Sequence, residues 1–304
     1  MNFESISLTQ GQMPVGDNQP FRKPRLALMG EFSAGKSTLA NLLVGAQHLP
    51  MQVTATQLPP VWISQGNAAP YRVDLEGKSI PVSLARLEDV PILETAYIRM
   101  FENSDILEQC DIIDMPGISD PNMPATVWQR VLPQADGVIW CTHATQAWRQ
   151  SESAIWSTMT PELQQRSLLL LTRIDKIVAE RDRDRIVKRV SRETSGQFFG
   201  PCLPISLTKA IVAKENSLAR DAAGATAFYG VLVGLLDAIA KDHKQPTAPR
   251  RPVSSVVIDS ATAPVLPRRI RSDTSSAVQT PRPPAGSMDP DLAAFRALIH
   301  KDTR

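Results

Sequence analysis

Gly30-Glu31-Phe32-Ser33-Ala34-Gly35-Lys36-Ser37-Thr38 is the stretch that decides the fold of this chain. The apolar run 26–29 before it is typical of a buried strand, and the run 37–43 after it favours a helix. Backbone N–H groups in such a loop, together with the positive end of the helix dipole, form a concavity that binds phosphate. Lys36 can reach phosphate oxygens, and the Ser37 hydroxyl can ligate Mg²⁺. The stretch predicts an α/β domain that binds a nucleoside triphosphate.

Two further motifs indicate which nucleotide is bound. Asp114-Met115-Pro116-Gly117 follows the strand-like run 110–113, so its carboxylate can hold Mg²⁺ through water and the Gly117 amide can contact the γ-phosphate. Thr172-Arg173-Ile174-Asp175 follows the apolar run 168–171. Asp175 can accept two N–H groups from the guanine edge, which adenine does not offer. The alternative for Asp175 is a helix cap, but the order of the motifs favours GTP over ATP.

The three motifs resemble the first, third and fourth guanine-nucleotide motifs of bacterial dynamin-like GTPases. Residues 49–56 are similar to the switch I segment of that family, which implies that Thr54 binds Mg²⁺ and the γ-phosphate. Thr56 remains an alternative, because Ala55 and Gln57 stand where the family often has Pro and Thr. The resemblance covers about residues 23–242.

Two other segments carry the same resemblance. Ser206 lies where a fifth motif would contact the base, and residues 145–152 also look like the family's pattern. The resemblance implies an enlarged P-loop G domain, a mostly parallel sheet with helices on both faces. The separation of 60 positions from Thr54 to Asp114 predicts an insert, with a strand-like piece at 71–75 and a helical piece at 85–90.

The predicted nucleotide-binding residues are Gly30, Glu31, Phe32, Ser33, Ala34, Gly35, Lys36, Ser37, Thr38, Gly117, Thr172, Arg173, Asp175 and Ser206. The predicted metal ligands are Ser37, Thr54 and Asp114, and the predicted catalytic residues are Lys36, Thr54 and Ser33. Mg²⁺ is the expected cofactor, with a monovalent cation as a further candidate. Together with Lys36 they would absorb the charge that develops during phosphoryl transfer, while the Thr54 backbone orients the water.

The attacking water has no obvious side-chain partner near the phosphates. Ile118 follows Gly117 where signalling GTPases carry a glutamine, and Phe32 replaces the polar residue of eukaryotic dynamins. Two expectations stay open: a GTPase activated by face-to-face dimerisation of G domains, as the resemblance implies, or a nucleotide-binding scaffold with negligible turnover.

Composition is that of a chain with one substantial core. It has 304 residues, 42% of them hydrophobic, and a formal charge of +2. No apolar run approaches the roughly 20 residues that span a bilayer. The start has no signal-peptide pattern, so we expect a cytoplasmic protein, with peripheral contact at the inner membrane as an alternative. Cys110, Cys141 and Cys202 are scattered on predicted strands, which favours reduced, buried thiols. The four histidines form no cluster.

The chain divides into four predicted parts. Residues 1–22 form a flexible leader, 23–242 the GTPase domain, 243–288 a disordered tail rich in Pro, Arg and Ser, and 289–302 a short helix. Inside the domain, the apolar positions Phe228, Leu232, Leu235, Leu236 and Ile239 predict a last helix packed on the sheet. Leu292, Phe295, Leu298 and Ile299 make the short helix amphipathic, so we expect it to dock on its own G domain or on a partner.

The tail and the missing stalk leave three functional classes. Within residues 246–290, six arginines and three aspartates give a charge of +3, so the rest is near neutral and indicates no nucleic-acid groove. A solvated linker, contact with acidic membrane and contact with a protein are the alternatives for the tail. Since nothing after residue 242 has room for a stalk, we expect a GTP-hydrolysing switch that acts with a partner such as a second dynamin-like chain. The other classes are the scaffold and a membrane remodeller that borrows its stalk.

Overall fold

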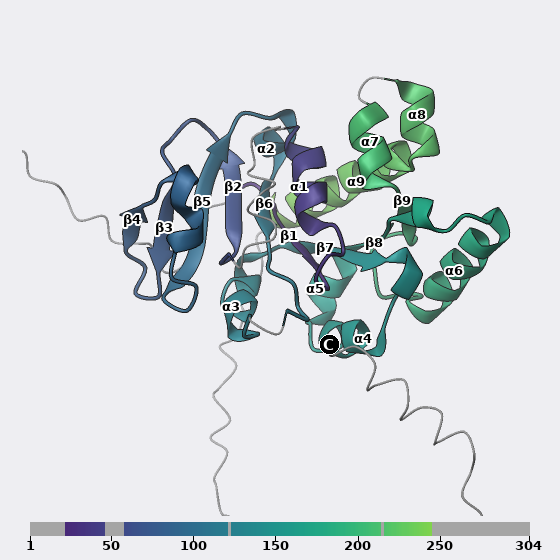
Figure 1. Cartoon of the computed structure of the whole chain (residues 1–304), viewed down its shortest axis with the longest axis horizontal. Helices are drawn as coiled ribbons and strands as arrows, with labels where there is room; N and C mark the ends of the chain where they lie inside the picture. Colours follow the sequence, from purple (N-terminus) through teal and green to yellow (C-terminus); the bar gives the residue numbers. More distant parts are fainter. Residues whose placement is uncertain (1–21, 46–57, 121–122, 214–215, 245–304) are drawn as a thin grey trace, which may run out of the picture. The chain divides into compact units, whose positions relative to one another are not determined.

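The computed structural model describes residues 22–45, 58–120, 123–213 and 216–244 (Figure 1). Within these residues one sheet has the strand order β4-β3-β5-β2-β6-β1-β7-β8-β9. The strands are β1 (Arg25–Gly30), β2 (Val61–Gln65), β3 (Tyr71–Asp74), β4 (Ser79–Pro81), β5 (Thr95–Glu102), β6 (Asp111–Asp114), β7 (Gly137–His143), β8 (Leu168–Thr172) and β9 (Leu203–Ile205).

Helices connect most of these strands. They are α1 (Lys36–Val44), α2 (Asp105–Gln109), α3 (Thr126–Gln129), α4 (Gln150–Trp156), α5 (Pro161–Gln165), α6 (Glu180–Glu193), α7 (Leu207–Ala213), α8 (Ser217–Ala222) and α9 (Ala225–Lys244). Short 3₁₀ turns are η2 (Leu84–Asp89), η3 (Leu132–Gln134), η4 (Ala144–Gln146) and η5 (Ile174–Lys176). In the part of the chain described here, no helix has the length and apolarity needed to cross a membrane.

The sheet is mostly parallel, as predicted. Strand β1 pairs in parallel with β6 and β7, and β7·β8, β8·β9 and β2·β5 are also parallel. The pairs β2·β6, β3·β5 and β3·β4 are antiparallel. The predicted insert supplies the strand β3 and the turn η2, so its pieces extend the sheet at one edge (Figure 1). The fold class expected from the motifs is confirmed.

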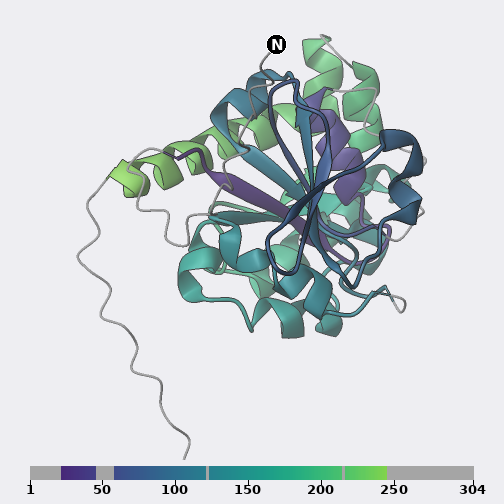
Figure 2. The ribbon, with the colours of Figure 1, turned by 90° about the vertical axis from the view of Figure 1, so that its left-hand side faces the viewer.

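Alternating side chains of the central strands fill two cores. Leu26 and Leu28 of β1 pack with α1 and α9 on one face, whereas Ala27 and Met29 pack with α3, α4 and α6 on the other. This alternation follows from the two-residue period of a strand, and both faces are apolar because helices cover both. Figure 2 shows the sheet between the two helical layers.

The predicted last helix is confirmed as α9. Phe228, Leu232, Leu235, Leu236 and Ile239 are all buried against the sheet, as their helical spacing requires. The helix continues to Lys244, two residues beyond the predicted end of the domain. It begins after Gly224, where a β-carbon would lie 2.2 Å from the carbonyl oxygen of Pro204, so glycine is needed for the close approach to β9.

The three cysteines are free and buried. Only Cys141 lies within a strand; Cys110 and Cys202 immediately precede β6 and β9, which corrects their predicted placement. Burial raises the pKa of each thiol to about 12, so the thiolate form is suppressed. The thiols are therefore unreactive core groups, in agreement with the prediction of reduced cysteines.

A buried carboxylate ties together the segments at the start of β1, the start of β7 and the end of α9. Arg22 donates to both oxygens of Asp136, at 2.7 and 2.6 Å, and the backbone N–H of Arg25 donates to Oδ2 at 2.9 Å. His243 Nε2 lies 3.3 Å from Asp136 Oδ1. Since the Asp136 side chain is only 8% exposed, these partners replace the water it loses.

We expect Asp136→Asn to lower the free energy of unfolding by about 2 kcal/mol, because the variant loses the negative charge and places an NH₂ donor where a carboxylate oxygen now accepts. Urea unfolding monitored by circular dichroism measures the loss. Asp242→Asn is the matched control: its ion pair with Arg166 is also 2.7 Å long but half-exposed, so about 0.5 kcal/mol or less is expected. Equal losses in the two variants would contradict the role of Asp136.

Candidate nucleotide-binding site

The loop between β1 and α1 is fixed by two glycines. Gly30 has φ +142°, and a β-carbon there would lie 2.1 Å from the carbonyl oxygen of Cys141 in β7. Gly35 has φ +93°, and its β-carbon would lie 3.1 Å from Leu207 Cδ1 at the start of α7. No other residue type fits either position without strain. The loop is therefore held between β7 and α7, with its backbone turned toward the start of α1.

The remaining loop residues differ in exposure. Ser33 is exposed and has φ +59°, a left-handed conformation that non-glycine residues rarely adopt. Ala34 is buried and its N–H donates to the carbonyl oxygen of Glu31 at 3.2 Å. Ser37 and Thr38 lie half-buried in the first turn of α1. Backbone strain of this kind occurs at ligand-binding loops, and the loop fits a phosphate cradle.

Lys36 lies curled into the loop. Its Nζ donates to the carbonyl oxygens of Gly30 and Glu31, at 3.2 and 2.9 Å, and the residue is only 7% exposed. Burial lowers the pKa of this ammonium group, and the nearby Asp114 carboxylate acts in the opposite direction. Phosphate oxygens would offer the ammonium group the same kind of acceptors with negative charge.

Asp114 meets Ser37 next to this lysine. Leu28 of β1 is the register partner of Asp114 at the end of β6, which brings the carboxylate beside the loop. Burial raises the pKa of Asp114, while its hydrogen bond with the Ser37 hydroxyl and the charge of Lys36 oppose the shift. Its Oδ1 is buried and has no hydrogen-bond partner. A hydroxyl beside an unpartnered carboxylate oxygen is the ligand chemistry that fits Mg²⁺.

The residues described in the structure contain no group of three His, Cys, Asp or Glu side chains that could hold a metal by themselves. This agrees with the usual magnesium site of phosphoryl-transfer proteins, where one or two side chains act together with water and substrate phosphates. The predicted third ligand, Thr54, and its alternative, Thr56, lie outside the described residues.

The segment that follows Asp114 packs directly on the phosphate-binding loop. A β-carbon on Gly117 would lie 2.9 Å from Phe32 Cα, and the N–H of Ile118 donates to the carbonyl oxygen of Gly30 at 3.2 Å. The N–H of Phe32 donates to Ser119 Oγ at 3.2 Å, a contact that the sequence did not indicate. The Phe32 ring is 57% exposed, so it offers a water molecule no polar partner.

Thr172 contacts the phosphate-binding loop through its side-chain hydroxyl. It ends β8 and is fully buried, and its Oγ1 lies within hydrogen-bond distance of the carbonyl oxygens of Ala34 and Thr142, at 2.8 and 3.2 Å. The hydroxyl of Thr172, a residue that we predicted to bind nucleotide, is therefore engaged within the protein. Arg173, the next residue, is exposed and has φ +54°, so the chain turns sharply out of β8.

Asp175 and Ser206 lie at the neighbouring ends of β8 and β9, since Thr172 and Ile205 are register partners. Partial burial acts to raise the pKa of Asp175, but the Ser206 hydroxyl, the Asp175 backbone N–H and two lysines outweigh it, so the pKa is lowered. Ser206 Oγ is buried and makes no hydrogen bond of regular geometry, so we interpret its contact with Asp175 as proximity. An ionised acceptor and an unpartnered hydroxyl fit the polar edge of a guanine base.

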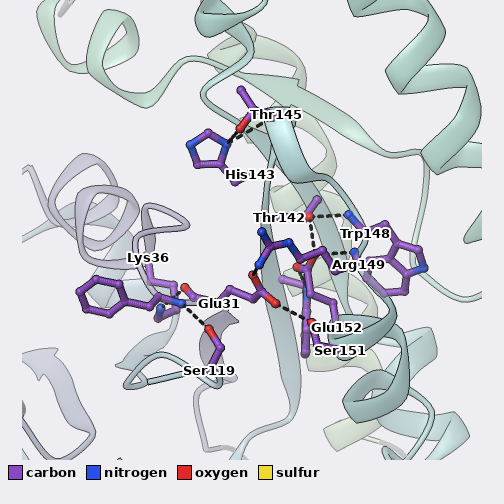
Figure 3. A network of polar contacts seen from close by, with 12 residues as sticks. Glu31, Lys36, Ser119, Thr142, His143, Thr145, Trp148, Arg149, Ser151 and Glu152 are labelled. Carbon is purple, nitrogen blue, oxygen red and sulfur yellow. Dashed lines mark hydrogen bonds and ion pairs between the residues drawn. The ribbon is translucent and has the colours of Figure 1, made fainter. Parts of the chain in front are cut away.

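Side chains from the β7–α4 segment join this site, although the sequence analysis gave them no role (Figure 3). Glu31 directs its carboxylate to Arg149 and Ser151, not to the centre of the loop. His143 ends β7; partial burial lowers its pKa, and Arg173 and Arg149 lower it further. The resemblance of residues 145–152 to a family pattern was the one signal in the sequence.

The loop after β1, the acidic motif after β6 and the polar groups after β8 and β9 define a P-loop G domain. Residues 26–174 match the dynamin family. Over 191 residues, the chain is 24% identical to dynamin-like protein 2 of Campylobacter jejuni, covering 61% of this chain and 31% of that protein. The chain therefore carries a dynamin-like P-loop G domain, as the motifs predicted.

Solved structures of bacterial dynamins have the same fold. Two come from an oligomerised bacterial dynamin pair, described as providing a mechanism for long-range sensing and tethering of membranes. One has a TM-score of 0.52 at 19% identity and the other 0.53 at 17%; each match covers 73% of this chain. They cover 36% and 37% of those chains, so this chain spans roughly a third of the length of its dynamin relatives.

We expect Asp175→Asn to weaken GTP binding about a hundredfold, because an amide is uncharged and turns an NH₂ donor toward one of the two guanine N–H donors. The variant should bind xanthosine triphosphate better than the wild type does, since xanthine has an acceptor where guanine has an amino group. Titration with fluorescent nucleotides measures both. Asp221→Asn, an exposed carboxylate on α8, serves as control; unchanged GTP affinity in Asp175→Asn would exclude the base contact.

We expect Thr172→Val to lower the free energy of unfolding by about 1–2 kcal/mol and to weaken GTP binding severalfold, because the buried carbonyl oxygen of Ala34 loses its donor. Urea unfolding and nucleotide titration report the two effects. In Thr158→Val, an exposed hydroxyl that donates to the Ile155 carbonyl oxygen at 2.7 Å is removed, and neither quantity should change measurably. Loss of stability with full GTP affinity would mean that Thr172 does not hold the loop.

Proposed function

We propose that the chain binds GTP with Mg²⁺ and hydrolyses it to GDP and phosphate, as a dynamin-like switch protein. One observation carries the proposal: Asp114 keeps a buried oxygen without a partner beside Ser37, next to the largely buried Lys36 of the loop. Unpartnered buried polar atoms are costly, and a nucleotide with its cation would satisfy this one.

Each group would have a separate part in binding. The loop N–H groups and Lys36 hold the phosphates, Ser37 and Asp114 hold Mg²⁺, and Asp175 with Ser206 selects guanine. Mg²⁺ would supply neutralisation of the charge that develops on the β- and γ-phosphate oxygens. Phe32 and Ile118 are apolar and have no group that could orient the nucleophile. Orientation of the water is therefore assigned to Thr54 or Thr56.

Pairing of G domains and a partner chain are further parts of the proposal. The solved relatives come from an oligomerised bacterial dynamin pair, which supports oligomerisation and a second dynamin-like chain as partner. A homodimer through the G domain is proposed from the resemblance of the motifs. That pair is described in terms of membrane sensing and tethering, and the charge of +3 over residues 246–290 supports peripheral contact of this chain with an acidic membrane. The near-neutral remainder of the chain gives no support to nucleic-acid binding.

A nucleotide-binding scaffold with negligible turnover is the second candidate. The exposed Phe32 ring favours it, because the side chain at this position cannot hydrogen-bond the attacking water. The two candidates share every binding residue and differ only in the rate of the chemical step. Binding measurements alone do not separate them, so the decisive quantity is turnover per site.

Phosphate release from GTP and from ATP, measured for wild type and Lys36→Ala across protein concentration, tests the proposal. We expect GTP-selective turnover that rises with concentration and disappears in Lys36→Ala, because the variant removes the cation that holds the phosphates. Lys188→Ala, an exposed lysine on α6, should behave as wild type. Tight GTP binding without turnover would favour the scaffold, and absence of GTP binding would exclude both candidates.

A further inference from the structure

The second residue of the phosphate-binding loop is an acid whose two oxygens are both engaged. Arg149 Nη1 lies 3.1 Å from Glu31 Oε2, and Ser151 Oγ donates to Oε1 at 2.6 Å (Figure 3). The Glu31 side chain is 13% exposed, whereas that of Arg149 is 47% exposed. The carboxylate is thus held at the edge of the loop by two side chains from the segment between β7 and α4.

The backbone that presents Arg149 is strained. Trp148 has φ +54°, which is an outlier for a bulky aromatic residue and persists only where the surroundings enforce it. Its N–H donates to Thr142 Oγ1 at 2.9 Å, and its ring packs edge-on against Trp140 and Trp156, with centroids 6.1 and 6.4 Å away. The packing and this hydrogen bond fix the direction of the backbone at the next residue, Arg149, which immediately precedes α4.

A buried acid supports the same segment. Glu152 is 2% exposed and accepts hydrogen bonds from Trp140 Nε1 and Thr142 Oγ1, both at 2.9 Å, and from the N–H of Arg149 at 3.0 Å. The N–H of Arg149 therefore cannot move without leaving a buried carboxylate oxygen short of a donor. Strained backbone, aromatic packing and a buried acid converge on one result, a fixed position for Arg149 beside Glu31.

We propose that Arg149, assisted by Ser151, is a positioning residue that neutralises Glu31 and holds its carboxylate away from the phosphates. The inference rests on the GTP binding proposed above. A triphosphate brings several negative charges to a loop that contains Glu31 and lies beside Asp114. An unrestrained Glu31 carboxylate would repel the triphosphate, because a protein screens the repulsion between nearby charges less than bulk water does. The cation of Arg149 removes that repulsion without touching the nucleotide.

The role differs from that of an ordinary surface ion pair, which contributes little. If the pair between Arg149 and Glu31 only stabilised the fold, its loss would lower the free energy of unfolding. The ratio of the affinities for GTP and GDP would then stay the same. If it acts through the charge of Glu31, the loss should weaken GTP binding more than GDP binding, because GTP carries the additional phosphate. Removing the charge of Glu31 as well should then restore the ratio of the GTP and GDP affinities.

The dissociation constants of fluorescent GTP and GDP analogues with Mg²⁺ test this, in wild type, R149M, E31Q and the double variant E31Q/R149M. We expect R149M to raise the constant for GTP about fivefold and that for GDP less. The dissociation constant of the double variant for GTP should lie within about twofold of that of E31Q. The increase that R149M causes in this constant should become smaller at high salt. R149K, which keeps the charge, should recover most of the affinity, and S151A should lose about twofold.

R185M is the control, because it removes an exposed arginine whose partner is Asp182 on α6; it should bind GTP as wild type does. Thermal unfolding verifies that each variant is folded. If R149M is not folded, the GTP affinities of S151A and R149K test the role of the contacts with Glu31. The proposal would be overturned if R149M lowered the GTP affinity equally in the wild-type chain and in E31Q. It would also be overturned if R149M lowered the GTP affinity in neither. Wild type that binds no GTP would instead refute the proposed function.

Discussion

The structure depends on one close approach between backbones: the carbonyl oxygen of Cys141 in β7 occupies the space that a side chain at position 30 would need. Strand β1 can therefore approach β7 this closely at its last residue, before the loop begins, only because residue 30 is glycine. A second approach, of Gly117 to Phe32, joins the acidic motif to the same loop. These contacts fix the loop from two sides before any ligand is present, which is the preorganisation that anion binding requires.

The site keeps several polar groups in conditions that are unfavourable without a ligand. Lys36 is a cation whose burial favours the neutral form, Asp114 is an acid whose burial favours the protonated form, and Ser206 Oγ has no regular partner. Each of these conditions costs stability, and they occur together at the carboxyl ends of the parallel strands β6, β1 and β9. At this edge of the sheet the buried polar groups are a cation and an acid side by side, whereas the central strands contribute mainly apolar side chains to the two cores.

The sequence predicted what depends on local patterns. The glycine spacing of the loop, the apolar runs of the central strands and the helical period of α9 gave the fold class and most of the site. The sequence did not indicate the Glu31–Arg149 pair, because its members are 118 positions apart and meet only through the sheet order. It also left the Thr172 hydroxyl open to ligand contact, since its use by Ala34 depends on how the loop packs on β8. The antiparallel pairing of β2 with β6 likewise follows from tertiary context.

The carboxylate of Asp136 has a mechanical consequence. It accepts from Arg22 and from the backbone of Arg25, and it also lies against His243 near the end of α9, so residues near both ends of the described chain meet at one carboxylate. A tensile load applied at Arg22 or at His243 would therefore reach the same point. Since Arg25 begins β1, that point also lies at the start of the strand that leads to Gly30.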